Sequence, residues 1–170
     1  MTIDGFWADA NGRSVFPIDD LHRCGLLDSL IQRTGAVIWS QRSFDSADDP
    51  DWYACNYEYQ VPIVVVKPAP PCRPKEDCGL RFVFVEDFEA ALEAAAAACG
   101  ERDVMIIGEA GMVQVALSSG RVDEFYLRLV QTIIGRGEAL LGLNLPRTNF
   151  VLDDVARTDS CIHLHLIRRA

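Results

Sequence analysis

Two glycines with a two-residue gap, Gly108 and Gly111, stand between a short apolar run and a helical pattern. A strand that ends in glycine and leads into a helix leaves backbone N–H groups unpaired beside the positive end of that helix. Such a turn can bind a phosphate group. The same spacing fits a tight strand-to-helix connection without a ligand equally well, so the spacing alone leaves both interpretations open.

The elements that position this turn are predicted within residues 103–141. Residues 104–107 are a continuous apolar run, which predicts a strand buried on both faces. The apolar spacing of residues 112–117 predicts a helix, and Gly120 is placed to end it in a left-handed conformation. Residues 123–134 predict a further strand, after which Gly135 and Gly137 turn the chain.

The rest of the chain alternates between helical and strand patterns. Asp19 or Asp20 is expected to cap a helix that runs through Arg33, and the alanine-rich residues 86–99 predict a second helix. Strands are predicted at residues 62–67 and 80–85, on either side of a proline-rich loop, and a closing hairpin at residues 149–155 and 161–167. This order predicts one three-layer α/β domain over residues 1–170, with a mostly parallel central sheet and a C-terminal antiparallel hairpin.

Composition narrows the class of protein. The chain has 170 residues, 49% of them hydrophobic, and a net charge of −9, which is typical of one globular domain with a sizeable core. No apolar stretch is long enough to cross a bilayer, and the N-terminus lacks the pattern of a signal peptide, so we expect a cytoplasmic protein without membrane association. The acidic balance disfavours nucleic-acid binding.

Cysteine and histidine spacing predicts no metal site. The six cysteines include no CxxC pair and are expected to be mostly reduced, the alternative being a disulfide between Cys72 and Cys78. His163 and His165 share one face of the last predicted strand and could ligate a metal together, but no third ligand is evident.

Residues 45–60 are acidic and aromatic without a clear period, which indicates a loop or short helix. Their aromatic side chains could cover a flat ring by stacking, or they could pack as a satellite of the core. The frequent burial of aromatic residues favours the second interpretation. The residues concerned are Trp52, Tyr53, Tyr57 and Tyr59.

The stretch from residue 104 to 141 also resembles a known family. It is similar to the C-terminal half of proteins of the dihydrofolate reductase-like family. The matching positions are Gly108, Ala110, the GRVDE segment at residues 120–124 and the IIGRG segment at residues 133–137. The resemblance is closest to the reductase domain of the bifunctional deaminase–reductase of riboflavin biosynthesis and its stand-alone bacterial relatives. Glu109 stands where that family usually has a second glycine, and Gln131 where it usually has proline.

Two further segments carry the resemblance. Residues 2–8 resemble a signature that follows the first strand in the family, and that strand is nearly absent here: either the start is misassigned or the domain lacks most of it. Residues 35–45 resemble a second signature, a strand that turns into a helix. Arg42 and Ser43 match it, whereas Ser40 replaces a glycine and Gln41 replaces an arginine.

The resemblance implies a dihydrofolate reductase-like fold and an NADPH-dependent reductase that transfers hydride to a small pterin- or pyrimidine-like heterocycle. It also implies a homodimer. It places Asp4, Gly5 and Phe6 at the active-site wall. The cofactor-binding residues that it implies are Trp39, Ser40, Gln41, Arg42, Ser43, Lys67, Arg73, Gly108, Glu109, Ala110, Gly111 and Met112, with Lys75 as an alternative to Arg73.

The departures from the family pattern motivate an alternative function. A carboxylate at a phosphate-binding turn repels an anion unless it points away or pairs with Arg42. Glu109, Ser40 and Gln41 therefore also fit a degenerate family member that binds a ligand or partner without hydride transfer.

Overall fold

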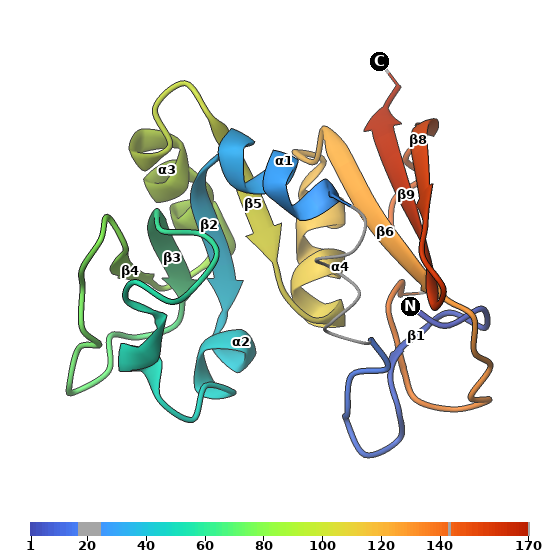
Figure 1. The fold of residues 1–170 in the computed structure, drawn as a ribbon, viewed down its shortest axis with the longest axis horizontal. Helices are drawn as coiled ribbons and strands as arrows, with labels where there is room; N and C mark the ends of the chain where they lie inside the picture. The colour runs from blue at the N-terminus through green and yellow to red at the C-terminus, as the bar shows by residue number, and fades with distance from the viewer. Residues whose placement is uncertain (17–24, 143, 170) are drawn as a thin grey trace. The chain divides into compact units, whose positions relative to one another are not determined.

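The computed structural model describes residues 1–16, 25–142 and 144–169 (Figure 1). The predicted caps Asp19 and Asp20 lie outside the described residues. The chain divides into two compact units, one of residues 28–112 and one of residues 1–27 and 113–170. A single domain over residues 1–170 stays a prediction.

The unit of residues 28–112 is built on four parallel strands in the order β4-β3-β2-β5 (Figure 1). They are β2 (Thr34–Ser40), β3 (Pro62–Val66), β4 (Arg81–Val85) and β5 (Asp103–Ile107). β2 is buried along its whole length, as expected for a central parallel strand with a continuous apolar sequence. The prediction that residues 104–107 are buried on both faces is wrong: these residues are half-buried, because β5 lies at an edge of this sheet.

Helix α3 (Phe88–Ala98) packs against β2 and β3. Asp87 caps its N-terminus by accepting a hydrogen bond from the Ala90 N–H, and Gly100 follows its end with a φ of +65°. Ala91 and Ala95 are fully buried, so the small side chains allow a close approach of helix and sheet. Helix α1 (Leu26–Arg33) precedes β2 in the chain and buries two of its leucines.

An aromatic cluster packs beside the end of β2. The Trp39 ring lies 5.0 Å from the Tyr53 ring and 5.1 Å from the Tyr57 ring, both in edge-on contact. Burial raises the pKa of the Tyr57 hydroxyl well above its usual range. Tyr53 belongs to the short 3-10 helix η2 (Pro50–Tyr53), as the prediction of a loop or short helix allowed. The aromatic cluster is therefore satellite core packing, and only Trp52 is largely exposed, at 55%.

A disulfide joins Cys55 to Cys78, so the prediction of mostly reduced cysteines is wrong for these two, and Cys72 is not the partner of Cys78. The bond links the loop after η2 to the end of the proline-rich loop. The proline-rich loop is also joined to η2 itself, by a hydrogen bond of 2.7 Å from the Lys75 N–H to the Asp51 carboxylate. The pairing comes from this tertiary contact between loops, which cysteine spacing does not reveal.

The unit of residues 1–27 and 113–170 holds an antiparallel sheet in the order β6-β9-β8. Its strands are β6 (Glu124–Val130), β8 (Phe150–Arg157) and β9 (Cys161–Arg168), and the last two form the predicted hairpin. β6 ends at Val130 rather than at residue 134 as predicted. The Thr132 N–H donates to the Val130 carbonyl at 2.8 Å, and this tight turn takes the chain out of the strand.

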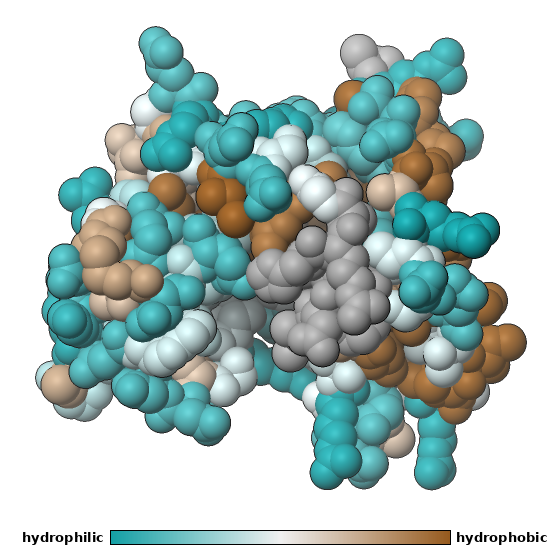
Figure 2. All heavy atoms as spheres, viewed as in Figure 1, coloured by the Kyte–Doolittle hydropathy of each residue, from teal (hydrophilic) through white to brown (hydrophobic). Residues whose placement is uncertain are grey.

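The strand register separates this sheet into two faces of different chemistry. Tyr126, Arg128, His163 and His165 lie on one face, where the Tyr126 and His165 rings stack at 4.3 Å. We call the other face the apolar face. Its apolar residues are Phe125, Leu127, Leu129, Phe150, Leu152, Val155, Ile162, Leu164 and Leu166, and the register also places Arg157 and Arg168 on it, at opposite ends of the hairpin. Figure 2 shows hydrophobic side chains at the surface over β8 and β9.

A second, two-stranded sheet in this unit was not predicted. β1 (Phe6–Ala8) pairs antiparallel with β7 (Glu138–Ala139). Position 137 requires glycine, because a Cβ there would clash with the Ala8 carbonyl oxygen. Upstream of β1, Met1 and Ile3 make backbone hydrogen bonds of 2.8 and 2.9 Å to residues at the end of β6.

Helix α4 (Ala110–Ser119) follows β5, as predicted, and Gly120 follows its end with a φ of +68°. The boundary between the two units falls within this helix, after Met112. Among the described residues, no helix has both the length and the apolar character needed to cross a membrane.

Candidate functional site

Two turns come together where β2 and β5 end. The strands are parallel neighbours with Trp39 opposite Ile107, so the residues that follow each strand emerge at the same edge of the sheet. Helix α2 (Gln41–Asp45) begins at once after β2, with Ser40 as its N-cap. The Ser40 hydroxyl oxygen accepts a hydrogen bond from the Ser43 N–H at 3.0 Å, which is the usual role of serine at this position.

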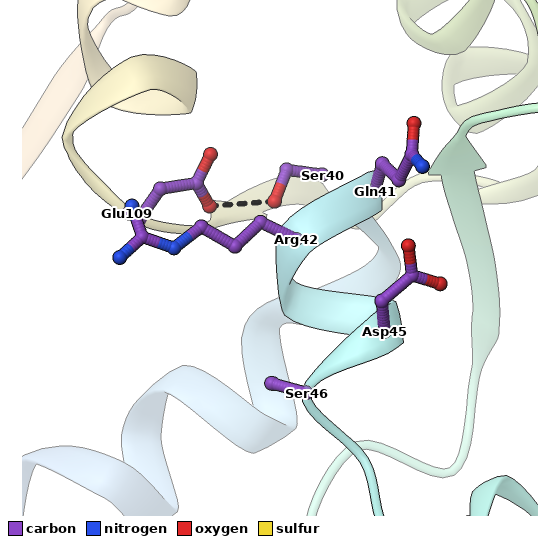
Figure 3. Close-up of a pocket in the computed structure, with 6 residues that line it drawn as sticks. All are labelled: Ser40, Gln41, Arg42, Asp45, Ser46 and Glu109. Atoms are coloured by element: carbon purple, nitrogen blue, oxygen red, sulfur yellow. Dashed lines mark hydrogen bonds between the residues drawn. The ribbon is translucent and has the colours of Figure 1, made fainter. Parts of the chain in front are cut away.

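Glu109, from the turn after β5, bonds to this N-cap (Figure 3). The Ser40 hydroxyl donates to Glu109 Oε2 at 2.5 Å, and the Ser43 hydroxyl donates to the same oxygen at 3.4 Å. The two hydroxyl oxygens are 3.1 Å apart. The carboxylate thus joins the two turns, and it accepts hydrogen bonds where a bound anion would accept them.

The two glycines of the turn after β5 differ in whether a side chain would fit at their positions. A Cβ on Gly108 would come within 2.7 Å of the Met112 Cβ in the first turn of α4, so the close approach of helix and turn requires glycine there. A Cβ on Gly111 would meet nothing closer than Glu109 Oε1, at 3.4 Å, so α4 tolerates a side chain at this position. Ala110, the first residue of α4, is almost completely buried.

A pocket of about 650 Å³ opens at these two turns. This volume is within the range of small-molecule sites. Figure 3 shows its lining side chains on α2 and on the turn after β5. The lining residues are Ser40, Gln41, Arg42, Asp45, Ser46 and Glu109.

The charges of the pocket nearly balance. The Asp45 carboxylate accepts a hydrogen bond from the Lys67 ammonium group at 2.5 Å, and this contact lowers the pKa of Asp45. Lys67 also lies 4.9 Å from the centre of the Phe44 ring. Arg42 and Glu109 are the other two charged residues among those that line the pocket.

The structure brings some of the predicted cofactor-binding residues together and leaves others apart. Ser40, Gln41, Arg42 and Glu109 line the pocket, Ser43 bonds to Glu109, and Lys67 reaches it through Asp45. Arg73 lies over the Phe84 ring at 5.9 Å instead, and Trp39 packs in the aromatic cluster. Sequence reasoning missed Asp45 and Ser46; their position one helical turn after Gln41 and Arg42 was the available signal.

The unit of residues 1–27 and 113–170 contains the predicted active-site residues Asp4, Gly5 and Phe6. They form a turn that is held by hydrogen bonds. The Asp4 carboxylate accepts hydrogen bonds from the Gly135 N–H at 2.7 Å and the Ile134 N–H at 3.2 Å. The Phe6 N–H donates to the Thr2 hydroxyl at 2.9 Å, and Gly5 has a φ of +90°. The turn is thus fixed against the glycine-rich loop that precedes β7.

The contribution of this turn to stability depends on pH through the Asp4 carboxylate. A hydrogen bond from the Thr2 side chain, followed by those from backbone N–H groups, lowers the pKa of Asp4 below its ordinary value of 3.8. Its contribution to stability is therefore complete above that value and is lost as the pH falls through the lowered folded-state pKa. In urea unfolding from neutral to acidic pH, the stability advantage of the wild type over Asp4→Asn should disappear in acid. Parallel pH profiles would contradict this expectation.

The two histidines of β9, which were considered as metal ligands, lie in different surroundings. His165 lies between the Glu124 carboxylate, 2.9 Å from Nε2, and the Asp153 carboxylate, 3.0 Å from Nδ1. His163 is buried on the same face of the sheet. Within residues 1–16, 25–142 and 144–169, the side chains grouped closely enough to hold a metal ion are those of Cys55, Asp77 and Cys78, and the disulfide there uses both thiols.

Comparison with known proteins identifies the fold. No family model and no curated protein sequence matches the chain. A protein assigned to riboflavin biosynthesis from Shewanella sp. PV-4 matches 100% of this chain and 96% of its own, with a TM-score of 0.70 and 18% sequence identity. RibD from Acinetobacter baumannii matches 99% of this chain and 56% of its own, with a TM-score of 0.72 and 20% identity.

A third structure extends the comparison. The diaminohydroxyphosphoribosylaminopyrimidine deaminase/5-amino-6-(5-phosphoribosylamino)uracil reductase from Thermotoga maritima matches 99% of this chain and 54% of its own, with a TM-score of 0.69 and 14% identity. This chain therefore spans about half the length of the last two proteins.

The chain has a dihydrofolate reductase-like α/β fold, with a parallel sheet and an antiparallel hairpin as predicted. The three solved structures named above, RibD and two other riboflavin-biosynthesis proteins, share this fold. At identities of 14 to 20%, the likeness confirms the predicted resemblance at the level of the fold.

Proposed function

We propose that this protein is an NADPH-dependent reductase that transfers hydride to a small pterin- or pyrimidine-like heterocycle. The observation that supports it best is the pocket where β2 and β5 end, in a fold shared with a protein whose name includes a uracil reductase. A cytoplasmic location is part of the proposal. The exposed Cys55–Cys78 disulfide, a bond typical of oxidising compartments, is the feature that opposes it.

The pocket suits a phosphate-bearing cofactor in its volume and in most of its polar groups. The Ser40 and Ser43 hydroxyls lie at the pocket, where both donate to Glu109, and Arg42 carries a guanidinium, a group that pairs well with phosphate oxygens. NADPH supplies the hydride when bound, and the protein's part is placement and electrostatics. The other proposed contacts are Trp39, Gln41, Lys67, Arg73, Gly108, Ala110, Gly111 and Met112, with Asp4, Gly5 and Phe6 beside the substrate. Glu109 is the lining residue that opposes an anion.

Arg42→Ala tests the cofactor proposal directly. Removing a charged donor to phosphate should weaken NADPH binding by about tenfold or more. Titration calorimetry with NADPH, and with NADH in parallel, measures the change. Arg81→Ala is the control, because Arg81 is exposed on the same unit and does not line the pocket. Failure of the wild type to bind either nucleotide at millimolar concentration would exclude the proposed cofactor.

A second function is favoured by one contact. Glu109 already accepts the hydrogen bonds of Ser40 and Ser43, so the pocket also suits a protein that binds a ligand or a partner without hydride transfer. Saturable NADPH binding without oxidation of the cofactor, in the presence of a panel of reducible heterocycles, would favour this second function over the first.

The proposal includes a homodimer that forms through the apolar face. Leu152 and Val155 on this face are 52% and 48% exposed, and most residues of β9 and β6, the next strands of the same sheet, are half-buried. A continuous apolar surface of this kind is typical of a protein–protein interface. A two-fold axis would bury the same surface on both copies.

Two valines of β8 allow a matched test of this interface. Val155 and Val151 are both 48% exposed, but the register places Val155 on the apolar face and Val151 on the opposite face. Val155→Glu should therefore convert the dimer to a monomer in sedimentation velocity, while Val151→Glu should remain dimeric. A monomeric wild type, or equal behaviour of the two variants, would refute the proposed interface.

A further inference from the structure

We propose that Glu109 determines which ligands this pocket accepts, because its carboxylate occupies the place that a ligand phosphate would take at Ser40 and Ser43. The inference rests on the proposed function, which puts a phosphate-bearing ligand at these turns. It adds that the wild-type protein binds such ligands more weakly than its other pocket residues allow, and that a single side chain causes the difference.

The hydrogen bonds at Ser40 exclude a second anion. A serine hydroxyl has one proton to donate, and Ser40 donates it to Glu109 Oε2 at 2.5 Å. The Ser40 oxygen is also the acceptor for the Ser43 N–H, which fixes its orientation. A phosphate oxygen would need the same proton, so phosphate and the Glu109 carboxylate compete for one donor.

The second oxygen of the carboxylate stays beside the turn after β5, to which Glu109 itself belongs. Glu109 Oε1 is 3.4 Å from the position of a Cβ on Gly111, the second residue of α4. One carboxylate therefore reaches both turns that a phosphate was expected to contact. Among the described residues, the non-glycine residues with positive φ are Cys55 and Cys78, so Glu109 has an ordinary backbone that other side chains can adopt.

Lys67 does not neutralise the Glu109 carboxylate at these hydroxyls. The Asp45 carboxylate already holds Lys67 at 2.5 Å, so the nearby ammonium group serves a different anion. The Glu109 charge therefore lies directly on the two hydroxyl donors, where an incoming phosphate would meet a like charge at short distance.

Inorganic pyrophosphate, titrated by calorimetry, tests the inference without the cofactor. Glu109→Gln keeps the size of the side chain and removes its charge, and it should tighten pyrophosphate binding at least about tenfold. Asp48→Asn removes one exposed carboxylate of the same unit outside the pocket, and it should change little. Adding Ser43→Ala to Glu109→Gln should remove much of the gain, because the vacated hydroxyl is then lost. If Glu109→Gln does not fold, Glu109→Ala serves in its place.

The outcomes separate this inference from the proposed function. Equal affinity of wild type and Glu109→Gln for pyrophosphate, or no binding by either at millimolar concentration, would overturn the inference. Equal gains in Glu109→Gln and Asp48→Asn would overturn it as well, since the effect would then be one of general charge. A gain specific to Glu109→Gln supports it, even if NADPH oxidation by the wild type is never detected and the reductase proposal fails.

Discussion

Gly35→Ala should lower the free energy of unfolding by about 3 kcal/mol. A Cβ at this position would clash with the Cys99 carbonyl oxygen and lie 2.9 Å from the Arg102 Cβ. The obstacle is backbone at the end of α3, which cannot rotate away as a side chain can. Gly35 lies in β2, the fully buried central strand, at the point where its pairing with β5 is irregular. Urea unfolding of wild type and variant measures the loss.

Gly111→Ala is the control for this substitution. Gly111 lies in the first turn of α4, has an ordinary φ, and has 3.4 Å of space to its nearest neighbour. Alanine is the better helix former by up to about 1 kcal/mol, so this variant should be as stable as the wild type or slightly more stable. If both alanine variants lose similar stability, the close approach at Gly35 is not what requires glycine there.

Removing the disulfide is the second change with a large expected effect. Cys55 and Cys78 are 23 residues apart in the chain. Closing a loop of this length lowers the conformational entropy of the unfolded chain, which stabilises the folded protein by about 3 kcal/mol. The double variant Cys55→Ser/Cys78→Ser should therefore unfold at a lower urea concentration than the oxidised wild type.

A reductant and a third cysteine provide the controls. Reduction of the wild type should bring its unfolding midpoint close to that of the double variant, which itself should not respond to reductant. Cys72→Ser should match the wild type, because Cys72 is exposed and lies outside the disulfide. An oxidised wild type no more stable than the reduced protein would contradict the expected stabilisation.

Much of the fold was predictable because it depends on local patterns. The β-branched run of β3, the alanine-rich α3 and the glycines after α3 and α4 specify their elements within a few residues. The pairing of β1 with β7 was not predictable, since it depends on hydrogen bonds between segments far apart in the chain. The end of β6 was not predictable either, because Val130 and Thr132 bond there to Met1 and Ile3 as well as to each other. The Cys55–Cys78 pairing was missed for the same reason.

The candidate site was predictable as a location but not as an arrangement. The parallel pairing of β2 and β5 brings Ser40 and Glu109 together, and the family resemblance pointed to both turns. No sequence pattern indicated that the Glu109 side chain would turn back onto the Ser40 hydroxyl. The sequence also gave no sign that Lys67 would be paired with Asp45.

The position of Trp39 gives the protein an optical reporter next to the pocket. Trp39 is only 4% exposed, it directly precedes Ser40, and two tyrosine rings lie close enough to transfer excitation energy to it. Its emission should be that of an indole in an apolar environment, whereas the emission of the exposed Trp52 should be red-shifted and open to quenching by iodide. A ligand that displaces Glu109 from Ser40 alters the surroundings of the adjacent indole. In a Trp7→Phe variant, which lacks the third, half-buried tryptophan, the iodide-resistant part of the fluorescence can therefore follow binding without any label.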